Sequence, residues 1–184
     1  VETSAGFVAA PLVVNAAGPW AGEVGCWVGV DVPIINLART IVVTGPFPAI
    51  PSTRPLVEDV TAAWYIRPEG PGVLMGMGKV PTDNLDIQFS RDMLEPIIDV
   101  GVHRIPALEQ ASFLTGWTGV RPMTPDDHPI LGPVSTVDGF VLNCGWNGAG
   151  IILAPIAGQL AAEYISSGCT STMDIQPLRV ERFG

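Results

Sequence analysis

Arg121 is the side chain of this sequence best suited to binding a carboxylate. It follows an apolar, strand-like segment, Phe113–Val120, and precedes the rigid turn Pro122–Pro125. A guanidinium group is planar and can donate two parallel hydrogen bonds to one carboxylate, so it fixes the orientation of the bound group as well as its charge. A structural ion pair with Asp126 or Asp127 is the alternative interpretation.

Tyr65 offers a second donor for the same carboxylate. It begins the segment YIRPEGPGVLMG, residues 65–76, whose composition is typical of two short strands joined by a turn. Arg121 and Tyr65 are therefore the predicted substrate-binding residues, and no side chain is predicted to act as a catalytic acid or base. The alternative for Tyr65 is a place in the core or at its rim, where tyrosines are common.

The segment Leu142–Pro155 (LNCGWNGAGIILAP) reads as the end of a strand, a glycine-rich loop and the start of a helix. Gly145, Gly148 and Gly150 carry no side chain, so the backbone could approach a flat ligand closely. A helix N-terminus adds unpaired N–H donors and about half a positive charge. An ordinary strand–loop–helix corner is the alternative, because glycine loops are common.

The segment Val13–Trp20 (VVNAAGPW) follows a similar logic. An apolar strand ends in Ala16, Ala17 and Gly18, whose small side chains let the chain pass close to a ligand. A tight turn after the strand is the alternative interpretation of these three residues.

Asp126, Asp127 and His128 carry ligand atoms that divalent metal ions accept. Pro125 and Pro129 lie on either side of these three residues. Two prolines so close together favour an exposed turn over a cluster of inward-pointing ligands. We therefore predict no metal site.

Composition bears on the partners of the chain. Hydrophobic residues make up 47% of the 184 residues and charged residues 15%, against about 25% charged residues in an average protein. This low charge indicates deep burial or a covered surface; we favour a covered surface, because the sequence begins at Val1 in a strand-like segment. Homo-oligomers are one way to cover it. The net charge of −9 argues against nucleic acid, which requires clustered Lys and Arg.

Cysteine usage and hydropathy bear on the compartment. There are three cysteines, an odd number, and Cys26, Cys144 and Cys169 form no CxxC pair. This argues against a disulfide framework and favours a reducing, cytoplasmic compartment.

The uncharged stretch Gly139–Ala162 is long enough to cross a bilayer. Its glycines, Pro155 and amide side chains favour a strand, a loop and a buried helix instead, so no membrane span is predicted.

The helices and strands expected to position these residues indicate an α+β fold. An α/β module is expected together with an antiparallel module that carries a flanking helix. The predicted domains are residues 1–28 with 116–184, and residues 29–115 inserted between them. The expected elements are a buried strand over Gly6–Asn15 (best over Leu12–Asn15), a helix over Trp20–Val30, antiparallel strands within Ile34–Gly78, a helix over Arg91–Val102 with Pro96 in its first turn, a strand over Phe113–Val120, a strand over Gly139–Gly145, and a helix over Ile151–Ile165 ended by Gly168.

Three segments in this order and spacing resemble the D-amino-acid-oxidase-like family of FAD-dependent oxidoreductases. They are Val13–Trp20, Trp117–Gly132 (WTGVRPMTPDDHPILG) and Leu142–Pro155. The family includes glycine oxidase, sarcosine oxidase and dimethylglycine dehydrogenase. Residues 65–76 also resemble the central strands of its substrate domain. The resemblance covers nearly the whole chain and implies the C-terminal half of such an enzyme.

The resemblance implies FAD as the cofactor and a small amino acid as the substrate, with its carboxylate on Arg121. The residues that match the family's cofactor contacts are Ala16, Ala17, Gly18, Trp20, Gly145, Trp146, Asn147, Gly148, Gly150 and Ile151. In the family, the glycine loop and the helix after it face the N1/O2 edge of the flavin, where N–H donors stabilise the negative charge of the reduced ring.

The sequence also departs from the family pattern. The GxGxxG motif of a dinucleotide-binding domain is absent, and GMGKV at 76–80 follows a strand of the middle module. Two lysines of monomeric sarcosine oxidases correspond to Ile152 and Leu74, and their flavin-attaching cysteine has no counterpart near Gly119. These departures favour glycine-oxidase-like or dehydrogenase members.

The implied activity is oxidation of the C–N bond of an amino acid or N-methyl amino acid by hydride transfer to flavin N5. The alternative is a non-catalytic fragment, or a subunit that contributes half a site. Because the phosphate-binding motif is absent, we expect a missing N-terminal FAD-binding half as the partner. The chain alone is expected to bind FAD weakly or not at all and to be inactive.

Overall fold

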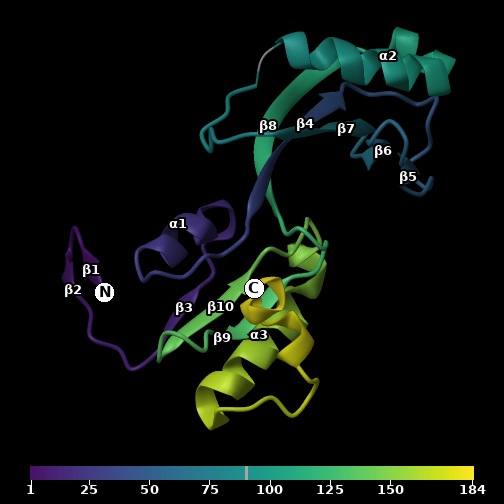
Figure 1. The fold of residues 1–184 in the computed structure, drawn as a ribbon. Coiled ribbons are helices and arrows are strands. Elements are labelled where there is room, and N and C mark those ends of the chain that lie inside the picture. Colours follow the sequence, from purple (N-terminus) through teal and green to yellow (C-terminus); the bar gives the residue numbers. More distant parts are fainter. Residues whose placement is uncertain (90) are drawn as a thin grey trace. The chain divides into compact units, whose positions relative to one another are not determined.

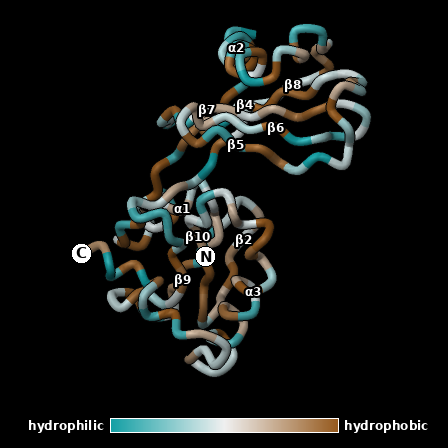
Figure 2. Tube along the Cα trace, turned by 90° about the vertical axis from the view of Figure 1, so that its right-hand side faces the viewer, coloured by the Kyte–Doolittle hydropathy of each residue, from teal (hydrophilic) through white to brown (hydrophobic). Residues whose placement is uncertain are grey.

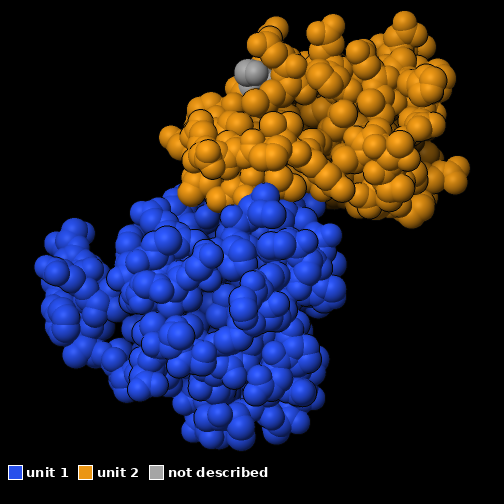
Figure 3. Space-filling model, viewed as in Figure 1, with its two compact units in different colours: residues 1–35, 121–184 blue, residues 36–120 orange. Residues whose placement is uncertain are grey.

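The computed structural model describes residues 1–89 and 91–184. The chain divides into two compact units, coloured separately in Figure 3. Unit 1 consists of residues 1–35 and 121–184, and unit 2 of residues 36–120. The insertion expected at 29–115 and unit 2 share residues 36–115.

Unit 1 is built on a three-stranded sheet in the order β3-β10-β9. Strand β10 (Phe140–Cys144) lies in the middle, parallel to β3 (Val13–Asn15) and antiparallel to β9 (Ile130–Pro133). The helices are α1 (Ala21–Cys26) and α3 (Gly150–Ser167), labelled in Figure 1. Short 3-10 helices follow β3 (η1, Gly18–Trp20) and end the chain (η4, Gln176–Leu178; η5, Val180–Phe183).

Apolar side chains on the two faces of the unit 1 sheet form two separate cores, because successive side chains of a strand point to opposite faces. Phe140, Leu142 and Cys144 belong to a cluster that also contains Ala21 of α1. Leu131 of β9 instead packs against a second cluster, formed with Leu160, Ala161 and Ile175. Figure 2 shows the hydropathy of each residue along the chain, with hydrophobic residues in brown. In the described part of the chain, no helix is both long and apolar enough to span a bilayer.

Unit 2 contains a five-stranded sheet in the order β5-β6-β7-β4-β8. The pairings from β5 through β6 and β7 to β4 are antiparallel. The strands are β4 (Ile35–Thr44), β5 (Val57–Asp59), β6 (Trp64–Glu69), β7 (Gly72–Pro81) and β8 (Phe113–Met123). Helix α2 (Leu94–Arg104) lies between two 3-10 helices, η2 (Arg91–Met93) and η3 (Pro106–Gln110). The predicted α+β class is confirmed.

Helix α2 is fixed to the sheet by Trp64. The indole of Trp64 is buried, and its Nε1 donates to the carbonyl oxygen of Ile97 at 3.1 Å. Gly101 has no side chain on the facing turn, and a Cβ there would lie 3.3 Å from the Trp64 ring. Pro96 is the third residue of α2, where its missing N–H interrupts no helical hydrogen bond.

Two predicted elements differ from the structure. The buried strand expected over Gly6–Asn15 is wrong in its first half, because Gly6–Phe7 (β2) pairs only with Glu2–Thr3 (β1) in an exposed hairpin. Only Val13–Asn15, beyond Pro11, joins the sheet. The helix expected over Trp20–Val30 ends at Cys26, and Gly29 then adopts a φ of +74°, which a right-handed helix does not accommodate.

The three cysteines are expected to differ strongly in reactivity. Cys26 and Cys169 are exposed, whereas Cys144 is buried, and this burial raises the pKa of the Cys144 thiol to about 12. Because the thiolate is the reactive form, an aromatic disulfide reagent at about pH 8 should modify Cys26 and Cys169 quickly and Cys144 only after denaturant is added. Equal labelling rates for all three in native buffer, measured by peptide mass spectrometry, would contradict this prediction.

Candidate functional site

Two loops of unit 1 leave its sheet at the same edge. Strands β3 and β10 are parallel, with Val13 opposite Phe140 and Asn15 opposite Leu142. Their carboxyl ends therefore lie side by side, and the chain continues from them into Ala16–Gly18 and into Gly145–Ala149. Loops at the carboxyl ends of neighbouring parallel strands form the usual ligand-binding edge of α/β sheets. The structure thus brings together the two segments predicted to contact the cofactor.

The loop after β3 is shaped by Asn15, which the sequence analysis did not single out. Asn15 is buried; its Nδ2 donates to the carbonyl oxygen of Ala21 at 2.9 Å, and its Oδ1 accepts from the amide of Ala17 at 3.2 Å. A Cβ added at Gly18 would meet no described atom within 4 Å, so the turn is open on that side. A polar residue that ends an apolar strand was the available signal for Asn15.

The loop after β10 lies directly on Thr124. Asn147 Oδ1 accepts from the Thr124 amide at 2.8 Å, and Asn147 Nδ2 donates to Thr124 Oγ1 at 3.1 Å. Gly145 (φ +66°) has no room for a side chain, because a Cβ there would lie 2.5 Å from Thr124 Cγ2. Trp146 packs against the core under α3 and donates from Nε1 to Asn143 Oδ1 at 2.8 Å. The shape of the loop is thus set by side-chain contacts on one side.

Helix α3 begins in this loop without a cap. No described side chain bonds to its first turn, and that turn contains no acidic residue. The amides of Gly150, Ile151 and Ile152 have no preceding helical carbonyl to donate to. The side chains of Ile151 and Ile152 are 91% and 82% exposed. Open N–H donors beside exposed apolar groups suit a ligand with an electron-rich oxygen on an apolar ring.

Arg121 lies on the other side of the glycine loop. Its half-buried guanidinium covers Gly148, where an added Cβ would come within 2.6 Å of Arg121 Cζ and Nε. Gly148 has a φ of +85°, a conformation that glycine adopts at little cost. Within residues 1–89 and 91–184, Arg121 forms no hydrogen bond or ion pair. A half-buried cation without a carboxylate partner is available to an anionic ligand.

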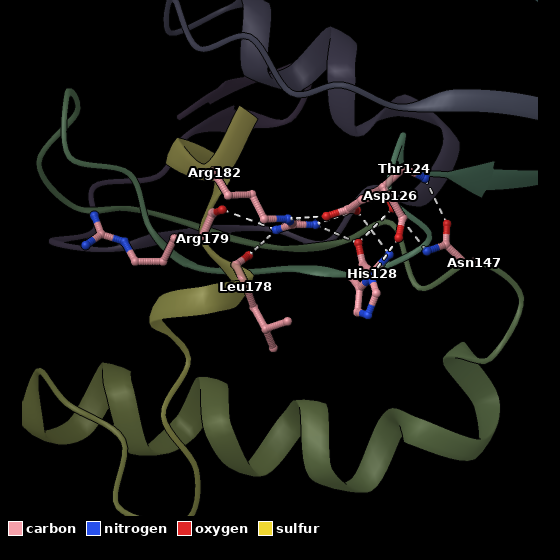
Figure 4. A network of polar contacts seen from close by, with 7 residues as sticks. All are labelled: Thr124, Asp126, His128, Asn147, Leu178, Arg179 and Arg182. Carbon is pink, nitrogen blue, oxygen red and sulfur yellow. Dashed lines mark hydrogen bonds and ion pairs between the residues drawn. The ribbon is translucent and has the colours of Figure 1, made fainter. Parts of the chain in front are cut away.

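Asp126 pairs with Arg182 rather than with Arg121. Arg182 Nε lies 2.7 Å from Asp126 Oδ2, and Arg182 Nη2 lies 3.1 Å from Asp126 Oδ1 (Figure 4). Hydrogen bonding from Arg182 holds the pKa of the Asp126 carboxyl well below its usual range. His128 donates its amide to the same carboxylate. In the described part of the chain, no three His, Cys, Asp or Glu side chains could hold a metal ion together.

Tyr65 belongs to unit 2, whereas the other candidate residues belong to unit 1. It lies on β6 opposite Gly76 of β7. Its ring covers Gly76, since a Cβ added there would overlap the ring and the hydroxyl oxygen. Leu74, two residues earlier on β7, is buried.

Comparison with known proteins decides the family. A family model described as FAD dependent oxidoreductase matches residues 1–164. The chain belongs to this family. It is 32% identical over 180 residues to the mitochondrial sarcosine dehydrogenase of Mus musculus, with 91% of the chain covered, and 28% identical over 183 residues to the glycine oxidase of Geobacillus kaustophilus, with 99% covered.

Two solved structures share the fold of the chain. Glycine oxidase from Geobacillus kaustophilus matches 97% of the chain with a TM-score of 0.84 and 26% identity. The L-proline dehydrogenase from P. horikoshii matches 99% of the chain with a TM-score of 0.84 and 25% identity. The chain spans 47% of that glycine oxidase structure, 49% of the proline dehydrogenase and 19% of the mouse sarcosine dehydrogenase. It therefore corresponds to half or less of each relative.

Proposed function

We propose that this chain forms part of an FAD-dependent oxidoreductase that oxidises the C–N bond of an amino acid or N-methyl amino acid. The observation that carries the proposal is the guanidinium of Arg121, half-buried on Gly148 of the glycine loop and without a carboxylate partner among the described residues. A bidentate bond from Arg121 to the substrate carboxylate would orient the amino acid at the loop. The names of the relatives, which include sarcosine dehydrogenase and glycine oxidase, support this substrate class.

The residues at the carboxyl ends of β3 and β10 are proposed to hold the cofactor. FAD, when bound, would accept the hydride from the substrate carbon next to nitrogen at its N5. The open turn at Ala16–Gly18 would lie along the cofactor without side-chain obstruction. The amides of Gly150 and Ile151 would donate to the electron-rich edge of the ring and stabilise its negative charge after reduction. Trp20, which is half-exposed after the β3 turn, would contribute apolar contact.

The proposed chemistry needs no side-chain base. The substrate amine would bind neutral, and the hydride would leave with the pair of electrons of its C–H bond. The iminium ion that remains would be hydrolysed by water to the carbonyl product and ammonia or an amine, with release of a proton. Positioning of the carboxylate by Arg121 would supply most of the protein's contribution to the rate, and Tyr65 stays a predicted second donor. A cytoplasmic location stays a prediction, since the sarcosine dehydrogenase relative is named as mitochondrial.

A second candidate function is that of a half-site subunit with a separate FAD-binding partner. GMGKV at 76–80 lies on β7 of an antiparallel sheet and opens no helix, so it does not supply a phosphate-binding turn. Large apolar side chains of unit 1 are exposed, among them Phe7, Ile151 and Ile152. Surfaces of this kind favour association with a partner or with a second copy.

The purified chain is expected to bind FAD weakly or not at all, because its uncapped helix and glycine loop do not replace phosphate contacts. The measurement is flavin absorbance after gel filtration, with and without added FAD. Retention of stoichiometric flavin by the chain alone would contradict the proposal that the chain is a half-site subunit.

The oxidoreductase proposal is tested separately. In the flavin-loaded assembly, glycine, sarcosine or proline added without oxygen should bleach the oxidised-flavin absorbance. No bleaching by any amino acid would refute it.

A further inference from the structure

We infer that the C-terminal segment of the chain acts on the substrate site, through a series of contacts from Arg182 to Arg121. The inference rests on the proposed role of Arg121 as the carboxylate anchor. In this reading, Arg182, Asp126, Thr124 and Asn147 are positioning residues. They hold the glycine loop in the shape on which the Arg121 guanidinium lies, and none of them touches the substrate.

The first link is the guanidinium of Arg182 on η5, drawn in Figure 4. Besides its two bonds to Asp126, Nη2 donates to the His128 carbonyl oxygen at 2.7 Å. Nη1 donates to the carbonyl oxygens of Leu178 and Arg179 at 2.7 and 3.2 Å. All three nitrogens are thus engaged, and the guanidinium lies 4.2 Å from the centre of the Phe183 ring. Three of these five bonds, those to Asp126 and His128, fix the C-terminal segment to the turn 124–128.

The second link is the turn itself. The Asp126 carboxylate accepts from the His128 amide at 3.1 Å, and Thr124 Oγ1 donates to the His128 carbonyl oxygen at 2.7 Å. That carbonyl oxygen therefore receives bonds from both Thr124 and Arg182. Between them, Asp127 has a φ of +58°, which an L-residue adopts at a cost when surrounding contacts impose it. Removal of Arg182 would release one side of this turn.

The third link joins the turn to the glycine loop. Asn147 has a φ of +51°, and its side-chain amide both accepts from and donates to Thr124. This pair holds the backbone at Asn147 so that the next residue, Gly148, lies under Arg121. Thr124 also follows Arg121 by three residues in the chain. Thr124 therefore limits the movement both of the glycine loop and of the chain that carries Arg121.

The inference is tested first on the chain itself by amide hydrogen exchange. Arg182→Gln removes the first link, and Asn147→Gly removes the third while it permits the positive φ. Each is expected to speed exchange at residues 147–149 about tenfold or more, with exchange in β10 unchanged, as expected for local opening. Arg104→Gln, which breaks the Asp59–Arg104 ion pair of unit 2, is the matched control. Unchanged loop exchange in both test variants, or equal acceleration throughout unit 1, would overturn the inference.

The link to the substrate is tested in the flavin-loaded full-length enzyme. Arg182→Gln should raise KM for an amino acid about tenfold, with kcat/KM for an amine that lacks a carboxylate unchanged. Arg182→Lys should recover only part of the loss, because an ammonium cannot form the planar set of bonds. If Arg121→Ala affects both substrates equally, the proposed role of Arg121 as the carboxylate anchor fails. If Arg121→Ala is selective for the amino acid but Arg182→Gln is not, only the inference fails.

Discussion

Replacement of Arg121 by alanine in the flavin-loaded full-length enzyme is expected to lower kcat/KM for amino acids by a factor of about 10²–10³, as for loss of a desolvated, charge-assisted hydrogen-bonded pair. The guanidinium is half-buried against Gly148 and forms no ion pair among the described residues, so its removal should cost substrate contacts without breaking a structural salt bridge. Steady-state kinetics with glycine, sarcosine and proline provide the measurement.

Two controls separate a binding role of Arg121 from a structural one. Arg121→Lys should recover only part of the activity, because a point charge lacks the bidentate geometry. An amine without a carboxylate should be oxidised slowly, at a rate that Arg121→Ala hardly changes. Equal losses for amino acid and simple amine would show a structural role. If neither loses activity, the carboxylate is held elsewhere, and Tyr65 or a residue of another segment becomes the better candidate.

Replacement of Trp64 by alanine is expected to destabilise unit 2 by about 3–5 kcal/mol, as for other large-to-small changes of buried aromatic residues. Trp64 is 1% exposed and lies in a cluster with Val42, Ile97 and Leu108. Its removal would leave a cavity between the sheet and α2, because Gly101 has no side chain that could fill the space. The unfolding free energy, from urea titration followed by circular dichroism, measures the loss.

Trp64→Phe is the matched control, since it keeps an aromatic ring but removes the donor that bonds Ile97. Its cost should be clearly smaller than that of Trp64→Ala. Hydrogen exchange in β6 and β7 locates the effect within unit 2, where Trp64→Ala should accelerate exchange while β9 and β10 stay protected. An alanine variant as stable as the parent chain would mean that α2 contributes little to the core of unit 2.

The sequence by itself determined the elements whose signals are local. Helix α3 was predicted within two residues at each end, because apolar residues continue from the loop and Gly168 supplies the left-handed C-cap. Pro96 lies in the first turn of α2, as predicted, although α2 begins at Leu94 and the expected start, Arg91, belongs to the 3-10 helix η2. The Pro- and Gly-rich breaks predicted β4, β6 and β7. Gly6–Phe7 misled the prediction because an apolar pair carries no information about whether a partner strand exists.

The glycine loop and the Ala16–Gly18 turn were each ambiguous in the sequence, since both motifs are common in ordinary turns. Their order and spacing pointed to the family, and the match over residues 1–164 shows it. Their juxtaposition follows only from the parallel pairing of β3 with β10. Parallel strands pair through long crossover connections, so neither strand's own residues specify the partner.

Only the tertiary structure decided which charged groups are free. Near Arg121 the sequence offers two acidic residues, Asp126 and Asp127, and local reasoning cannot tell which cation Asp126 binds. The fold brings Arg182, 56 residues away, to Asp126, and so leaves the Arg121 guanidinium over Gly148. The physical reason is that an ion pair requires two side chains to meet within about 4 Å, and for residues this far apart in the chain that distance is set by the packing of strands and helices rather than by neighbouring residues.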